Sequence, residues 1–120
     1  MYTAQTISLG TESDIVLLRM QVRDLARTVG MGLADQARVS LAASSLAKAL
    51  GLGTQHPGLA TFIGLARNGQ TGVRVICADK RAQSDCATGS LEEVRWMVDE
   101  LTLELLPSSI RQATLTKWRA

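Results

Sequence analysis

Residues 34–51 have the sequence ADQARVSLAASSLAKALG, which predicts one helix because alanine and leucine dominate it. Asp35 near its start would meet the positive end of the helix dipole, and Gly51 can adopt the left-handed conformation that ends a helix. Ser45 and Ala49 are four residues apart and therefore share a side of this helix. The apolar positions recur at steps of three and four and form a neighbouring stripe: Val39, Ala42, Ala43, Leu46 and Leu50.

The composition indicates one globular domain over residues 1–120. Hydrophobic residues make up 46% of the chain and charged residues 20%, and aromatics only 3%, so we expect an aliphatic core. A net charge of +2 does not indicate a nucleic-acid partner. No apolar run approaches the roughly 20 residues that span a bilayer, and the first residues do not resemble a signal peptide. We therefore expect a cytoplasmic protein without a membrane partner.

The cysteines and the single histidine do not predict a metal site. Cys77 lies in an alternating apolar run, which indicates a small buried hydrophobic residue, whereas Cys86 lies in a polar stretch. No C-x-x-C pair is present. His56 precedes Pro-Gly without a neighbouring Cys, Asp or Glu, which is typical of a loop residue.

The N-terminal part predicts a strand followed by a helix. The strand covers Gln5–Leu9, and the helix runs from about Asp14 to Val29 after capping residues at 11–14. Its apolar stripe is Ile15, Leu18, Val22, Leu25 and Val29. Beside it stand three arginines at steps of four: Arg19, Arg23 and Arg27. Like charges at this spacing do not stabilise a helix, so they form either a solvated flank or a contact surface for an acidic partner or a phosphate.

The C-terminal part predicts four strands and a helix. Alternating residues 59–66 and 73–78 indicate a hairpin, with Asn68-Gly69 as its turn. Ser90 and Glu93 have the spacing of a capping box and would start a helix that ends near Leu101. Two strands would follow, at 102–106 and 112–118, around a turn at 107–109.

The resulting order, β-α-α-β-β-α-β-β, predicts an α+β fold. Adjacent strands pair, and the helices can all cover one face of the sheet. We therefore expect a two-layer α/β sandwich with a mixed, largely antiparallel sheet.

This order and several motifs resemble the Bergerat-fold (histidine-kinase-like, GHKL) ATPases, and among them the bacterial anti-sigma-factor and switch-protein serine/threonine kinases. The resemblance covers almost the whole chain. The first two helices of that family resemble residues 22–27 (VRDLAR), 29–31 (VGM) and 35–39 (DQARV) of this chain. The family's strand that ends in the adenine-binding aspartate resembles residues 72–79 (GVRVICAD). Its last helix and strand resemble residues 94–101 (VRWMVDEL) and 114–118 (TLTKW). The resemblance implies a single Bergerat-type domain.

This chain departs from the family's pattern at two positions of the second helix. The family carries Glu-Leu-x-x-Asn there, in which the glutamate is the general base and the asparagine coordinates Mg²⁺. The resemblance places these positions on Ser45 and Ala49, with Leu46 and Lys48 between them. Ala49 has no oxygen for Mg²⁺, and a serine hydroxyl does not accept a proton at neutral pH as a carboxylate does.

The phosphate-binding segments depart as well. The family has Asp-x-Gly-x-Gly after its adenine-binding strand, whereas this chain has DKRAQ at 79–83, without either glycine. The glycine-rich ATP lid is reduced to residues 84–89. Only Asp79 remains of the nucleotide site that the resemblance implies, so we expect no catalytic residue, no bound metal and no cofactor.

Three hypotheses follow. The first is a catalytically inactive member of this kinase family that binds a sigma factor or a STAS-domain antagonist and so controls transcription. The second is a weak serine/threonine kinase, in which Asp79 holds the adenine of ATP and Lys48, Lys80 or Arg81 meets the phosphates. The third is a nucleic-acid-associated protein that uses Arg19, Arg23 and Arg27 with the basic end at 117–119. The sequence leaves monomer and homodimer open.

Overall fold

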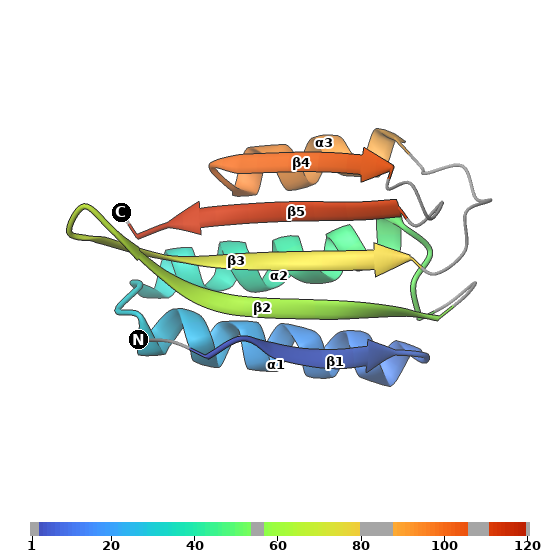
Figure 1. Cartoon of the computed structure of the whole chain (residues 1–120), viewed down its shortest axis with the longest axis horizontal. Helices are drawn as coiled ribbons and strands as arrows, with labels where there is room; N and C mark the ends of the chain where they lie inside the picture. Colours follow the sequence, from blue (N-terminus) through green and yellow to red (C-terminus); the bar gives the residue numbers. More distant parts are fainter. Residues whose placement is uncertain (1–2, 54–56, 80–87, 106–110, 120) are drawn as a thin grey trace.

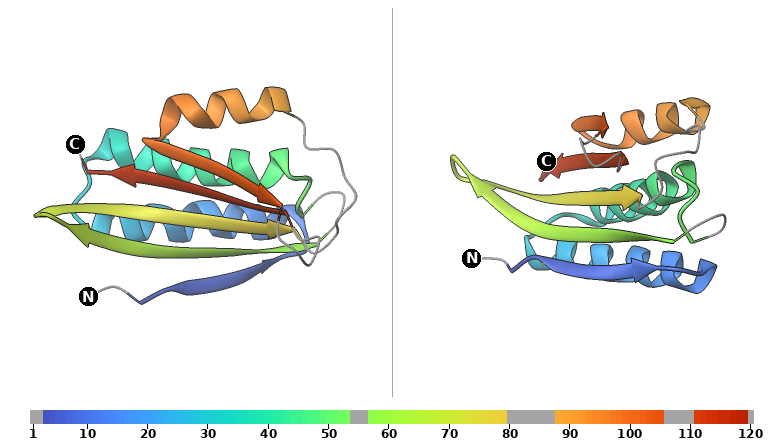
Figure 2. Two further views of the ribbon diagram at one scale, coloured as in Figure 1. Left: turned by 45° about the horizontal axis from the view of Figure 1, so that its top comes forward. Right: turned by 45° about the vertical axis from the view of Figure 1, so that its right-hand side comes forward.

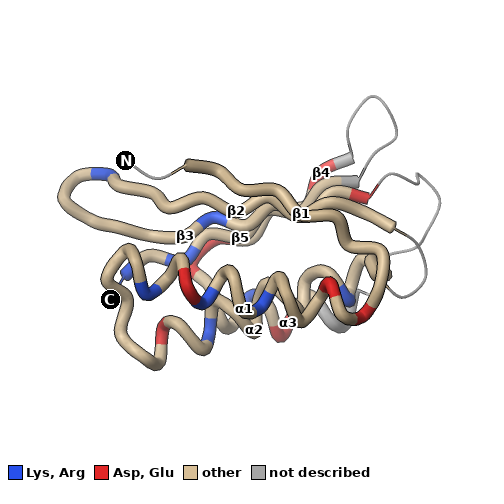
Figure 3. The backbone as a smooth tube through the Cα atoms, turned by 90° about the horizontal axis from the view of Figure 1, so that it is seen from below, with Lys and Arg blue, Asp and Glu red and all other residues tan. Residues whose placement is uncertain are grey.

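Three helices lie on one face of a five-stranded sheet in the computed structural model, which describes residues 3–53, 57–79, 88–105 and 111–119 (Figure 1, Figure 3). The elements are β1 (Gln5–Leu9), α1 (Glu12–Thr28), α2 (Leu33–Ala49), β2 (Gly58–Arg67), β3 (Gln70–Asp79), α3 (Thr88–Met97), β4 (Glu100–Leu105) and β5 (Arg111–Trp118). The predicted two layers, with all helices on one face, are confirmed. His56, Cys86 and the predicted turn at 107–109 lie outside the described residues.

Helix α2 lies in the middle of the helix layer, between α1 and α3 (Figure 1). It covers Leu33–Ala49, close to the predicted range, and Gly51 has the positive φ, 76°, that the sequence predicted for its end. Asp35 lies in its first turn, where its carboxylate is 3.8 Å from Nζ of Lys117 on β5. The predicted apolar stripe of α2 is buried against the sheet and the flanking helices.

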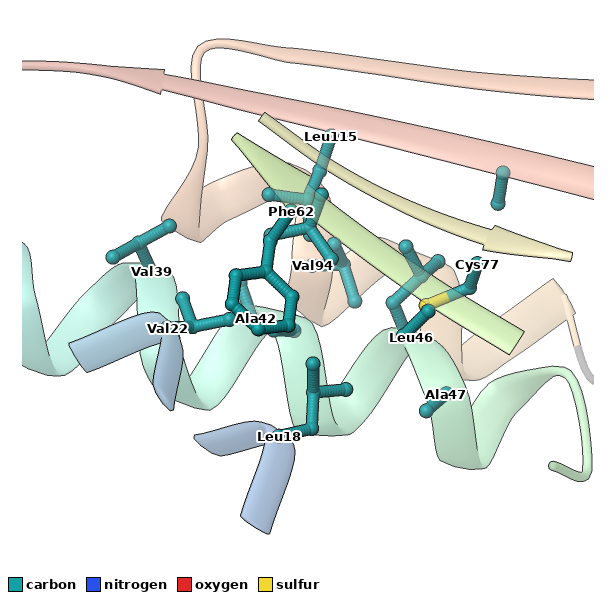
Figure 4. Close-up of a cluster of buried hydrophobic side chains, with 14 of the residues drawn as sticks. Leu18, Val22, Val39, Ala42, Leu46, Ala47, Phe62, Cys77, Val94 and Leu115 are labelled. Carbon is teal, nitrogen blue, oxygen red and sulfur yellow. The ribbon is translucent and has the colours of Figure 1, made fainter. Parts of the chain in front are cut away.

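The core lies between the two layers. Side chains from all three helices and from β2, β3 and β5 meet there (Figure 4). Among the described residues, Phe62 of β2 is the largest fully buried side chain, and it points from the sheet toward Ala42 of α2 (Figure 4). Cys77 of β3 is fully buried, as predicted, and burial raises the pKa of its thiol to about 12. The thiol therefore acts as a small apolar group in the core rather than as a nucleophile.

Helix α1 starts two residues earlier than predicted because Thr11 and Asp14 form a capping box. The Thr11 hydroxyl accepts a hydrogen bond from the Asp14 amide (3.3 Å). In return, Oδ2 of Asp14 accepts hydrogen bonds from the amides of Gly10 (2.8 Å) and Thr11 (3.0 Å). These two bonds, Gly10 first, lower the pKa of the Asp14 carboxyl, since they favour its charged form.

Replacing Asp14 tests this cap. Asp14→Asn is expected to lower the free energy of unfolding at neutral pH, because the amide loses the charge-assisted bonds. Because the pKa of this carboxyl is lower in the folded state than its unfolded value of 3.8, the charged group stabilises the folded state at pH values above 3.8. This stabilisation is lost as the pH falls through the lower, folded-state pKa. The difference between parent and variant in urea unfolding should therefore shrink on acidification. A difference that stays constant down to pH ~3 would contradict a role for the charge. Asp24→Asn, which removes an exposed ion pair with Arg27, is the matched control and should have little effect.

The hairpin of β2 and β3 turns at the predicted Asn-Gly pair. Asn68 and Gly69 have φ values of 53° and 80°, which a two-residue hairpin turn of type I′ requires. Both strands are longer than predicted, because their pairing continues to the turn, where Arg67 lies opposite Gln70. The tip of this hairpin extends beyond the helices (Figure 2).

The prediction for the third helix was wrong at both ends. Helix α3 starts at Thr88, so Ser90 lies inside the helix instead of capping it, and Leu101 belongs to β4. The helix stops because Asp99 binds β5: its amide donates to the carbonyl of Thr116 (3.0 Å), and its carboxylate accepts from the amide of Trp118 (2.7 Å). These contacts between distant residues override an apolar spacing that fits a continuing helix.

The predicted mixed sheet was also wrong, since all described strand pairs are antiparallel. The strand order is β1-β2-β3-β5-β4. Strand β4 lies at the edge, and β5 returns between β3 and β4, antiparallel to both. Strands β3 and β4 therefore run in the same direction, and α3 connects them across the sheet with β5 inserted between them.

Candidate functional site

A shallow hollow between α2 and α3 contains the two positions that the sequence singled out. It measures about 180 Å³ and is lined by Ser45, Lys48, Ala49 and Glu93. The first three lie on one side of α2 because they are three and four residues apart, and Glu93 faces them from α3. Ser45 is half-buried, and Ala49 is only 6% exposed. The helix positions predicted from the resemblance thus lie together at one hollow.

The chemistry available in this hollow is limited. Ala49 offers no side-chain oxygen, so Ser45 and Glu93 supply the oxygens, and Lys48 supplies the positive charge. No group of three or more His, Cys, Asp or Glu side chains that could hold a metal occurs in the described part of the chain. Sequence reasoning missed Glu93 as a site residue because its spacing from Ser90 indicated a helix cap.

Asp79 is not part of this hollow. It lies at the end of β3, is fully buried, and pairs in register with Gly58 of β2. The chain is tightly packed here, since a Cβ on Gly58 would lie 2.6 Å from the carbonyl oxygen of Ala78 and 2.5 Å from Leu52. Asp79 is therefore buried at the end of the sheet and is not among the side chains that line the hollow of Ser45 and Ala49.

A second hollow lies on the other side of α2, against α1. It also measures about 180 Å³, and it is lined by Glu12, Ile15, Val16, Arg19 and Lys48. Nε of Arg19 is buried there and has no hydrogen-bond partner within the described ranges. Lys48 borders both hollows and is the positive group that they share.

The three arginines of α1 do not form one row of free charges. Arg27 forms a surface ion pair with Asp24, in which Nη2 of Arg27 lies 2.8 Å from Oδ1 of Asp24. Arg23 is exposed, whereas Arg19 is half-buried in the second hollow. Arg19 and Arg23 therefore stay available to a partner, while Arg27 is already paired.

Large apolar side chains lie exposed on the helix layer, and sequence reasoning did not single them out. Val16 and Met20 of α1 are 48% and 61% exposed, Leu41 of α2 is 50% exposed, and Trp96 of α3 is 86% exposed. Exposed apolar groups beside basic side chains are typical of binding surfaces for proteins. The signal in the sequence was an apolar residue on the polar side of each predicted helix.

Comparisons with known proteins do not assign a family: no protein-family model matches the chain, and no curated protein does. Within the described ranges, none of the helices has the length and apolar character that crossing a membrane requires.

Proposed function

We propose that this chain is a catalytically inactive relative of the Bergerat-fold anti-sigma-factor kinases and regulates transcription by binding a sigma factor or a STAS-domain antagonist. The observation that carries the proposal is the hollow between α2 and α3. On the α2 side it presents Ser45 and Ala49, where the resemblance places the general base and the Mg²⁺ ligand. Phosphoryl transfer depends on positioned phosphates and on metal charge, and these side chains supply neither.

The binding surface is the outward side of α1 and α2. It combines the basic groups Arg19, Arg23 and Lys48 with exposed apolar side chains of the same helices. A partner segment that is both acidic and apolar, such as an amphipathic helix, complements this combination. Binding would thus use the helix layer and leave the sheet free.

A weak kinase is the second candidate, and the position of Glu93 favours it. Its carboxylate faces Ser45 and Lys48 across the hollow, so it offers a proton acceptor and Lys48 offers a phosphate contact. Asp79 is fully buried and is not among the residues that line this hollow, which argues for the inactive regulator.

One experiment separates the two candidates. The purified chain is titrated calorimetrically with a sigma factor and with a STAS-domain protein from the same organism, and each mixture is assayed for phosphate transfer from γ-labelled ATP. We expect one protein to bind and no phosphate to be transferred. Met20→Asp should weaken binding by about tenfold, equivalent to ~1.4 kcal/mol, whereas Leu103→Asp, 45% exposed on the edge strand β4 and outside the helix layer, should not.

The same samples are titrated with Mg-ATP alone. We expect no saturable heat up to millimolar nucleotide, since even that affinity requires about 4 kcal/mol and one hydrogen bond to a charged group contributes at most about 3 kcal/mol. Saturable binding that Asp79→Asn abolishes, together with labelled product that Glu93→Gln abolishes, would replace the regulator with the kinase. Absence of binding to both proteins would overturn the proposed function.

A further inference from the structure

The hollow between α1 and α2 is lined by charges of both signs. Glu12 and Arg19 of α1 and Lys48 of α2 border it, together with the apolar side chains of Ile15 and Val16. The four residues of α1 share one side of the helix because they occupy positions i, i+3, i+4 and i+7. Ile15 is 2% exposed and Val16 is 48% exposed, so this apolar wall is partly buried and partly reachable from solvent. The hollow therefore combines an apolar wall with three ionisable groups.

The three charged side chains of this hollow are not paired with one another. Among the described residues, none of Glu12, Arg19 and Lys48 forms an ion pair or a side-chain hydrogen bond. On the same helix, by contrast, Arg27 pairs with Asp24. Opposite charges that line one hollow of about 180 Å³ without pairing leave room between them for a charged ligand.

Arg19 offers a buried hydrogen-bond donor that the described part of the chain leaves unpaired. Its Nε is buried, and no described residue accepts a hydrogen bond from it. Buried donors in folded proteins are nearly always paired, because an unpaired donor loses its hydration without compensation. A carboxylate suits a guanidinium especially well, since its two oxygens can accept two parallel N–H bonds. Arg19 therefore indicates that the ligand carries a carboxylate.

The positions of the other two charges define the rest of the ligand. Glu12 lies in the first turn of α1 and Lys48 in the last turn of α2, so both belong to the end of the hollow where α1 begins. Arg19 lies seven residues after Glu12, which is ~10.5 Å further along α1. A ligand that pairs with all three groups has an ammonium next to a carboxylate at one end and a second carboxylate at the other. An amino acid with an acidic side chain has this arrangement.

We propose that the hollow between α1 and α2 binds a free acidic amino acid, and that glutamate fits it better than the shorter aspartate. The α-amino group pairs with Glu12, the α-carboxylate with Lys48, and the side-chain carboxylate with Arg19. The methylene groups of the ligand lie against Ile15 and Val16. Two positive groups and one negative group give the site a net charge opposite to that of glutamate at neutral pH. The inference does not depend on the proposed function, because this chain alone supplies the whole site.

Titration of the ¹⁵N-labelled chain with L-glutamate, followed by NMR at low ionic strength, tests the site. We expect saturable shifts of the amide signals of Glu12, Arg19 and Lys48, with a dissociation constant in the millimolar range, because so small a ligand makes few contacts. Two analogues serve as ligand controls: glutarate lacks the amino group, and L-glutamine lacks the second carboxylate. Each should bind the parent at least about tenfold more weakly than glutamate, because each leaves one charged group of the site unpaired.

Substitutions of the three charged groups assign each contact. Arg19→Gln and Lys48→Gln should each weaken glutamate binding at least about tenfold, with an unchanged circular dichroism spectrum. Glu12→Gln should abolish the preference for glutamate over glutarate, since that preference comes from the ammonium. Arg95→Gln, the same change at an exposed position of α3, is the matched control and should leave the dissociation constant unchanged.

Three outcomes would overturn the proposal. The first is the absence of saturable shifts up to tens of millimolar glutamate. The second is a parent that binds glutarate as tightly as glutamate, which would make the hollow a general anion site. The third is glutamate binding that stays unchanged in both Arg19→Gln and Glu12→Gln, which would place the ligand elsewhere on the chain. None of these measurements involves a protein partner, so their failure is distinct from a failure of the proposed function.

Discussion

Leu46→Asp is expected to leave the chain unfolded at 25 °C. Leu46 is fully buried in the middle of α2, the helix that both other helices flank. Burial of an unpaired carboxylate costs several kcal/mol, and a domain of this size has a total stability of only about 5–15 kcal/mol. Far-ultraviolet circular dichroism and urea unfolding should show loss of the cooperative transition.

The matched control is Leu41→Asp, the same substitution on the same helix at a position that faces solvent. Leu41 is 50% exposed, so its carboxylate stays hydrated and the free energy of unfolding should change by no more than about 0.5 kcal/mol. A folded Leu46→Asp variant with parental stability would mean that α2 does not pack in the core as described.

Phe62→Ala is expected to have the largest effect of any truncation in the sheet. Phe62 is 1% exposed and projects from β2 into the core formed with α1 and α2 (Figure 4). Truncating a buried phenylalanine typically costs about 3–5 kcal/mol, which combines the lost transfer free energy with the cavity left behind. The measurement is urea unfolding at one fixed protein concentration, with the midpoint and the slope compared to those of the parent.

Met20→Ala provides the comparison for Phe62→Ala. It removes a large apolar side chain that is 61% exposed, so the midpoint should move little. A loss below about 1 kcal/mol for Phe62→Ala would contradict its central place in the core, because a cavity of that size cannot close without cost.

Local signals in the sequence were sufficient to predict that three helices and the hairpin form, though not where α1 begins or where α3 begins and ends. The stripe of α2 and its Gly51 end follow from periodicity and backbone preference, and so does the Asn68-Gly69 turn. The end of α3 was not predictable in this way, because the contacts of Asp99 with β5 decide it. Strand order and direction depend on the same kind of long-range pairing.

The candidate site was predictable only in part. Helical spacing correctly placed Ser45 and Ala49 on one side of α2, where they line one hollow. The position of Glu93 opposite them depends on how α3 packs on α2, which no local pattern encodes. The arginines of α1 look equivalent in sequence, yet Arg27 is paired and Arg19 is half-buried, because each meets a different neighbour.

The place of β5 between β3 and β4 has a consequence for biosynthesis. Strand β4 pairs only with β5 among the described strands, so it has no hydrogen-bonding neighbour in the sheet while the ribosome is still making residues 111–118. The segment from β1 to β3, with α1 and α2, can already pair and pack at that stage. The edge of β3 therefore stays unpaired until β5 has been made, and an unpaired edge can pair with another nascent chain.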